Sequence, residues 1–280
     1  MAKSQQQDVL LPLVLKVRQG DPVSADALII KIRPLIYSVA LRFLWSPQDS
    51  EDIVQEILIK VITRLSQFSG KSLFSTWVYA IASNHLLDLK RRPMEESISF
   101  DEFADDLSQG LEINQTPEDS LLLEEVKIGC TLAMLQCLDR NHRISYILGE
   151  ILELDHKEAS VVLNISAGTF RKRLSRARAM INDFMLGNCG LVNPNNPCRC
   201  SGRVQTAQKL GRIDAKNLIF SSSQQTVKQF PEVLIKIRKL EQTRRASALY
   251  QSQVTIDDIS KPNPLFTHWL SDLIATGKLQ

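Results

Sequence analysis

The chain has 280 residues, a net charge of +3 and 23% charged residues, which suits an ordinary globular protein. No stretch approaches the roughly 18–20 uninterrupted apolar residues that a membrane span needs, and five cysteines, an odd number, argue against a disulfide framework. The first segment carries Lys16 and Arg18 in a helical pattern with no cleavage site after it, so we expect no signal peptide and a cytoplasmic protein.

Charge is unevenly distributed along the chain. Residues 188–280 hold 13 Lys and Arg against 6 Asp and Glu, and residues 94–126 contain no Lys or Arg. Five cations lie between positions 171 and 178. This segregation favours a nucleic-acid partner.

Residues 8–92 predict a first domain of helices with short breaks. In the helix that follows Ser46 or Asp49 as a cap, apolar residues recur every four positions at Ile53, Ile57, Val61 and Leu65. A second face of this helix carries Asp52, Gln55, Glu56 and Ile59. A solvated polar face is the ordinary interpretation, but the apolar Ile59 within it favours a partner surface.

The segment that follows is a loop leading into another helix, with Ser75 or Thr76 as the expected cap. Phe74 and Trp77 favour packing in the core. Residues 93–118 are acidic and have little periodicity, which predicts an acidic, flexible linker.

Residues 119–186 predict a second helical domain that contains a helix-turn-helix. Asp155 and Ser166 are expected to cap its two helices, and Phe170, Leu174 and Ala177 follow a helical rhythm. In such motifs the start of the second helix enters the major groove. The expected DNA-binding residues are therefore Ser166, Ala167, Thr169, Arg171, Lys172, Arg173 and Arg176.

Residues 187–280 form a C-terminal extension that we expect to be partly helical. It opens with Cys189, Cys198 and Cys200, which could bind zinc with a fourth ligand from elsewhere, act as redox-sensitive thiols, or be an inert loop. Cys130 and Cys137 are expected to be small core residues. The overall expectation is a mostly α fold of two small helical domains, joined by the acidic linker and followed by the extension.

Two of these stretches carry a resemblance to a known family. The segments SEDIVQE, FSGKSLFSTW and LKRR within residues 46–92, and GTFRKRLSRAR within residues 168–178, resemble extracytoplasmic-function (ECF) sigma factors of bacterial RNA polymerase. The second stretch departs from the family pattern at Phe170, where Val is usual, and at Lys172, where Ser is usual. We therefore identify the chain as resembling an ECF sigma factor with an atypical, Cys-containing extension.

The resemblance implies a set of roles. Residues 8–92 would bind core RNA polymerase and the −10 promoter element, and residues 119–186 the −35 element. Core polymerase would contact Asp52, Gln55, Glu56 and Ile59. The −10 element would contact Ser69, Lys71, Ser72, Asn84, Lys90, Arg91 and Arg92. The implied partners are core polymerase, promoter DNA and, as an open question, an anti-sigma factor.

Two other classes of function remain to be weighed. No phosphate-binding loop, nucleophile–base pair or carboxylate dyad has a suggestive spacing, so we expect no enzyme and no required cofactor. A helix-turn-helix regulator that acts without polymerase is the alternative, and the match over residues 49–92 argues against it.

Overall fold

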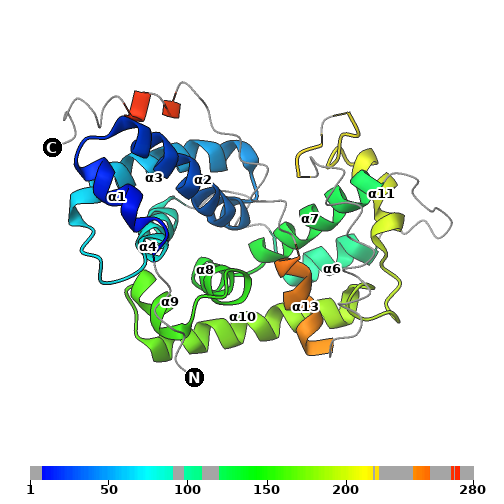
Figure 1. The fold of residues 1–280 in the computed structure, drawn as a ribbon. Helices are drawn as coiled ribbons and strands as arrows, with labels where there is room; N and C mark the ends of the chain where they lie inside the picture. The colour runs from blue at the N-terminus through cyan, green and yellow to red at the C-terminus, as the bar shows by residue number, and fades with distance from the viewer. Residues whose placement is uncertain are drawn as a thin grey trace.

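The computed structural model describes residues 8–90, 98–108, 120–216, 218–220, 242–252, 266–267 and 269–271, and these contain helices and no strand (Figure 1). The mostly α fold is thereby confirmed for the described residues. Among them, no helix combines the length and the apolar character that crossing a membrane requires.

The N-terminal bundle consists of α1 (Leu11–Arg18), α2 (Pro22–Leu44), α3 (Pro47–Thr63) and α4 (Phe74–Asp88). Ser46 caps α3, because its hydroxyl accepts a hydrogen bond from the Asp49 N–H at 3.3 Å. The four apolar residues predicted as a stripe, Ile53, Ile57, Val61 and Leu65, are all buried, the first three on α3 and the last in the 3₁₀ turn η1 (Leu65–Gln67) that follows it. The predicted cap and apolar stripe of this helix are therefore confirmed.

The acidic segment contains a helix that was not predicted from the sequence. α6 (Phe100–Ser108) begins with a capping box in which the Ser99 hydroxyl accepts from the Glu102 N–H at 3.2 Å and the Glu102 carboxylate accepts from the Ser99 N–H at 2.8 Å. Phe103 is buried and stacks on Phe184 with ring centroids 5.5 Å apart. The Phe100–Ser108 part of the predicted flexible linker is therefore helical and packed against the second module.

The second module consists of α7 (Ser120–Gln136), α8 (Arg140–Tyr146), the single π turn η2 (Ile147–Ile151), α9 (His156–Val162) and α10 (Ala167–Asn188). Figure 1 shows α10, the longest helix of this module, running past α8 and α9. It approaches η2 closely at Gly149, where a Cβ would lie 2.7 Å from Leu174 and 2.9 Å from Phe170. A glycine at this position lets the two helices touch.

The two modules meet at a joint built around Arg143, whose side chain is 1% exposed. Its guanidinium donates to the Phe43 carbonyl at 2.8 Å, near the end of α2, and to the Gln136 and Leu138 carbonyls of its own module. Arg140 also lies over the Phe43 ring and donates to the Leu87 carbonyl at 3.2 Å, near the end of α4. Two arginines of α8 thus bind carbonyl groups at the ends of two helices of the N-terminal bundle.

The described part of the extension contacts both modules. It contains α11 (Cys200–Lys209) and α13 (Gln242–Gln251), so its expected partly helical structure is confirmed. The buried Tyr250 on α13 donates its hydroxyl to the Thr131 carbonyl of α7 at 2.9 Å. Farther along the chain, the Ser271 hydroxyl bonds to the Asp26 carboxylate on α2.

Candidate nucleic-acid interface

Side-chain caps fix the starts of both helices of the helix-turn-helix, α9 and α10. The Asp155 carboxylate accepts from the N–H groups of Lys157 and Glu158 at 2.8 and 2.9 Å, and the Ser166 hydroxyl accepts from the Thr169 N–H at 3.0 Å. Between them Asn164 adopts a left-handed conformation, with φ of 51°, which turns the chain from α9 into α10. Both predicted caps of the helix-turn-helix are confirmed.

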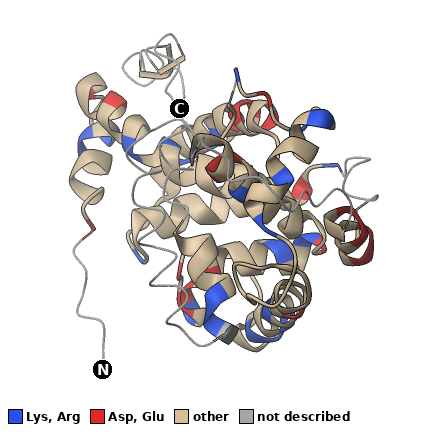
Figure 2. Ribbon diagram, turned by 90° about the vertical axis from the view of Figure 1, so that its right-hand side faces the viewer, with Lys and Arg blue, Asp and Glu red and all other residues tan. Residues whose placement is uncertain are grey.

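Two sides of α10 have opposite character. Phe170, Leu174 and Ala177 are buried, as their spacing predicted. The other side carries the run of cations from position 171 onward, of which Arg171, Lys172 and Arg176 are exposed. Figure 2 shows Lys and Arg residues interspersed with Asp and Glu along the ribbon of the described chain.

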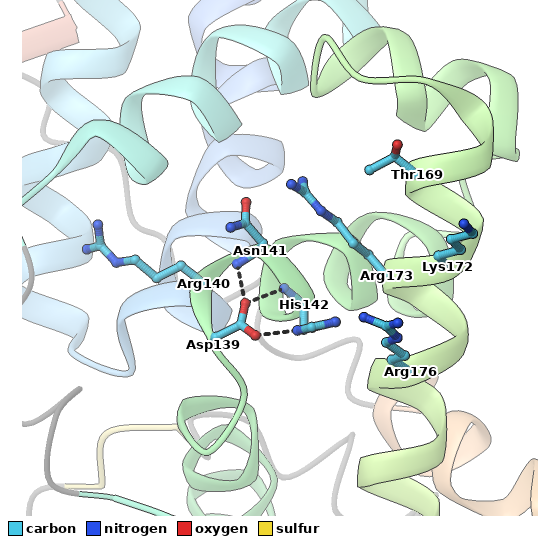
Figure 3. A pocket seen from close by; sticks show the side chains of 8 residues that line it. All are labelled: Asp139, Arg140, Asn141, His142, Thr169, Lys172, Arg173 and Arg176. Atoms are coloured by element: carbon cyan, nitrogen blue, oxygen red, sulfur yellow. Dashed lines mark hydrogen bonds and ion pairs between the residues drawn. The ribbon is translucent and has the colours of Figure 1, made fainter.

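The basic side of α10 borders an open hollow of about 390 Å³. Figure 3 shows Arg173 and Arg176 across from Asn141 and His142 at the start of α8. The hollow is lined by Asp139, Arg140, Asn141, His142, Thr169, Lys172, Arg173 and Arg176. Four of the seven residues predicted to bind DNA in the helix-turn-helix therefore share one concave surface. The N-cap Ser166 and the α10 residues Ala167 and Arg171 lie outside its lining.

One carboxylate lies within this basic surface. Asp139 caps α8 by accepting from the N–H groups of Asn141 and His142 at 2.9 and 3.0 Å. Partial burial raises the pKa of Asp139, but the hydrogen bonds from the His142 backbone and ring outweigh burial and hold that pKa below its usual range. The carboxylate is therefore engaged within the protein as a helix cap, while Lys172, Arg173 and Arg176 line the same hollow.

Not every cation of α10 faces this hollow. Arg178 pairs with Glu150 of η2, whose other carboxylate oxygen accepts from Ser247 of α13. The structure thus gives Arg178 a carboxylate partner inside the module.

The polar face of α3 is where the partner surface was predicted. Asp52 and Glu56 are exposed, whereas Gln55 and Ile59 are half-buried. A carboxylate oxygen of Glu56 lies 3.0 Å from Nε2 of His85 on α4, and Lys60 approaches the other ring nitrogen. Burial and the nearby Lys60 lower the pKa of His85, against the opposing effect of Glu56. The structure therefore buries His85 against α3.

The loop before α4 is held in place by Asp8 and Arg18, which lie near the start of the chain. The Asp8 carboxylate accepts from the Phe74 N–H at 2.6 Å. The N-cap of α4 is Leu73, so the expected caps Ser75 and Thr76 are wrong, and α4 begins two to three residues earlier than predicted. Arg18 donates to the Leu65 carbonyl at 2.6 Å, just before the loop. The rings of Phe68, Phe74 and Trp77 pack together with centroids 5.1–5.6 Å apart.

The residues predicted for the −10 element lie on this loop and at the far end of α4. Ser69, Lys71 and Ser72 are exposed around Gly70, whose φ of 72° suits a glycine, and Asn84 and Lys90 are exposed as well. Arg91 and Arg92 lie outside the described residues. Exposure makes these side chains accessible to DNA, and their contacts with DNA stay a prediction.

The three cysteines of the extension lie beside α7 of the second module. Cys189, Cys198 and Cys200 line a cavity of about 330 Å³ together with Cys130 of α7, which was expected to be an ordinary core residue. As the side chains stand, no three His, Cys, Asp or Glu residues in the described ranges are arranged to hold a metal ion. The zinc and redox hypotheses for the three extension cysteines therefore stay predictions.

Comparison with known proteins follows the two modules. The model of Sigma-70 region 2 matches residues 28–94, and that of Sigma-70 region 4 matches residues 128–181. Over 177 residues the chain is 31% identical to RNA polymerase sigma-H factor of Pseudomonas aeruginosa and 30% identical to ECF RNA polymerase sigma-E factor of Escherichia coli K12. These alignments cover 90% and 91% of the relatives and 61% of this chain. The chain belongs to the ECF sigma factors.

Two solved structures were also found to be similar to this sigma factor. CnrH in complex with the cytosolic domain of CnrY has a TM-score of 0.46 at 21% identity, covering 62% of this chain and 95% of that one. RpoE in complex with the anti-sigma factor NepR, from Bartonella quintana, has a TM-score of 0.40 at 21% identity, covering 56% and 93%. Both family-model matches end by residue 181, so the extension of this sigma factor lies beyond them.

Proposed function

We propose that the chain binds core RNA polymerase, recognises the −35 and −10 elements of a promoter and opens the DNA to initiate transcription. The observation that carries the proposal is the capped recognition helix α10, whose start borders a hollow with Thr169, Lys172, Arg173 and Arg176 in its lining. Membership of the ECF sigma factors supports the same function over a regulator that acts without polymerase.

Core polymerase is the partner we propose for the outer face of α3. Asp52 and Glu56 project from it as exposed carboxylates, with Gln55 and the apolar Ile59 beside them. An exposed pair of charges next to a half-buried apolar group suits an interface with an apolar centre and a polar rim. The family supports a non-catalytic role and a place in the cytoplasm with the polymerase.

Reconstitution with core polymerase tests this assignment. We expect promoter-specific transcripts from the full chain with core, and weaker core binding by a variant that combines Asp52→Ala with Gln55→Ala. Asp88→Ala, which removes an exposed carboxylate at the end of α4, is the matched control and should bind core as the wild type does. Promoter binding without any affinity for core would instead favour the helix-turn-helix regulator.

We further propose that the extension regulates the chain. Support comes from its contacts on both modules, at Thr131 through Tyr250 and at Asp26 through Ser271. Contacts of this kind can hold the modules in one relative position, which would oppose their separate engagement with core polymerase and with DNA. Combining Tyr250→Phe with Ser271→Ala removes both hydroxyls and should raise the affinity for core polymerase, and unchanged affinity would count against regulation by these contacts. Binding of a separate anti-sigma factor stays a prediction.

A further inference from the structure

Four of the five cysteines surround one cavity. Cys189 and Cys198 come from the loop after α10, Cys200 from the first turn of α11, and Cys130 from the facing side of α7. The fifth, Cys137, is one residue past the end of α7 and is absent from the lining of that cavity. Cysteines that are 59 to 70 positions apart in sequence are thus brought together by the packing of the extension on the second module.

The loop that carries the thiols is firmly built. The Arg199 guanidinium donates to the Pro194 carbonyl at 2.7 Å and to the Cys198 carbonyl at 2.9 Å. Side-chain amides of Asn193 and Asn196 each donate to the Leu186 carbonyl in the last turn of α10 at 2.9 Å. These bonds fix the loop to the helix that it follows.

The same loop brings two of the thiol-bearing residues side by side. Cys189 and Cys198 form an isolated backbone bridge, in which the Gly190 N–H donates to the Cys198 carbonyl at 3.2 Å. A Cβ at position 190 would lie 2.2 Å from that carbonyl oxygen, so the close approach of the two backbone segments requires glycine. The positions of the cysteines are therefore set by backbone structure.

Basic side chains lie near the buried thiols. Burial raises the pKa of Cys198 to about 11, and burial also raises the pKa of Cys130, Cys189 and Cys200, so the four are protonated and neutral at pH 7. Arg203 lowers the pKa of Cys130, as Arg199 does for Cys189 and Lys127 for Cys200. These cations would partly offset the negative charge of thiolates.

We propose that Cys130, Cys189, Cys198 and Cys200 together bind one zinc ion in this cavity. The ion replaces the four thiol protons, which go to solvent, and the product is a tetrathiolate complex with a net charge of −2 whose Zn–S distances are about 2.3 Å. Because no three of the four side chains are arranged to hold the ion as they stand, binding requires the cysteine side chains to change rotamer. The ion fastens the start of the extension to α7.

Zinc binding by the purified full chain tests the proposal. Competition for Zn²⁺ against a chromogenic chelator should give one ion per wild-type chain, and Co²⁺ should give the visible bands of a tetrahedral thiolate site. Cys130→Ser and Cys198→Ser should each lose stoichiometric binding, while Cys137→Ser keeps it. A wild-type chain that binds no zinc overturns the proposal, and wild-type affinity in Cys130→Ser overturns this set of ligands.

A second measurement needs no variant, in case a substitution prevents folding. Alkylation of the native wild-type chain, followed by mass spectrometry, should show four cysteines protected by Zn²⁺ and Cys137 modified at the same rate with and without the ion. Equal protection of all five, or of none, contradicts the site. Neither readout depends on polymerase or DNA, so failure here leaves the proposed function standing.

Discussion

The hydroxyl of Thr76, in the first turn of α4, donates a hydrogen bond to the carboxylate of Glu158, in the first turn of α9. Thr76 is buried, so this bond joins the bundle to the helix-turn-helix away from bulk water. Thr76→Val keeps the shape and removes the donor, and it should lower the free energy of unfolding by about 1.5–3 kcal/mol, as expected for a lost bond to a charged group. Urea denaturation measures this, with the neighbouring Ser75→Ala as control. An equal loss in both variants would contradict the contact.

Substitution by alanine should change stability in opposite directions at Gly149 and Gly187, because only Gly149 lies where α10 and η2 approach closely. Gly149→Ala places a methyl group under 3.0 Å from the side chains of Leu174 and Phe170, so it should destabilise the fold by roughly 1–3 kcal/mol through overpacking. Gly187→Ala, in the last turns of α10 with nothing within 4 Å, should stabilise it by about 0.5 kcal/mol through helix propensity. Thermal unfolding of the two variants should move in opposite directions.

Lys172 and Arg178 lie six positions apart on α10 and should affect DNA binding differently. Lys172 is exposed and lines the hollow, so Lys172→Ala should weaken promoter binding and lower the slope of log affinity against log salt by about 0.9 if it contacts one phosphate. Arg178 pairs with Glu150, so Arg178→Ala should leave that slope unchanged and lower stability instead. Lys157→Ala, an exposed lysine on α9, is the control for total charge. Equal slopes for Lys172→Ala and Lys157→Ala would remove Lys172 from the interface.

Burial of His85 predicts that the protein loses stability on mild acidification. Because burial, and next to it Lys60, lower the pKa of His85 below 6.5, the folded state binds a proton less readily than the unfolded state does. The stability due to neutral His85 is complete above pH 6.5 and falls as the pH drops below that value. His85→Gln should therefore unfold with a weaker dependence on pH between 7.5 and 5. Identical pH dependence in the wild type and the variant would show that His85 does not carry it.

Local patterns in the sequence were sufficient to predict features that depend on residues only a few positions apart. The apolar stripe of α3, the caps Asp155 and Ser166 and the buried face of α10 follow from spacing of three or four residues. The same reasoning could have found α6, since Ser99 and Glu102 form a capping box that is followed directly by the apolar Phe103. What misled the prediction was the acidic composition of the segment, which is typical of a linker.

Contacts between distant segments could not be predicted in this way. Asp8 caps a helix 66 positions away, and Arg143 binds a carbonyl 100 positions away, so neither has a signal in local periodicity. Cys130 looked like a core residue because its neighbours on α7 are apolar, and only the packing of the extension brings it to the other cysteines. The predicted contacts with polymerase and DNA concern partners that the fold alone does not specify.

Arg143 bears on how easily the two modules come apart. Its guanidinium is almost fully buried at the joint and donates to the Phe43 carbonyl across it. Removing a charge from water costs several kcal/mol, of which the carbonyl groups return only a part. When the joint opens, water hydrates that charge again, and the recovered hydration offsets some of the contacts that are lost. A joint built on a buried cation is therefore easier to reverse than an apolar one of the same area.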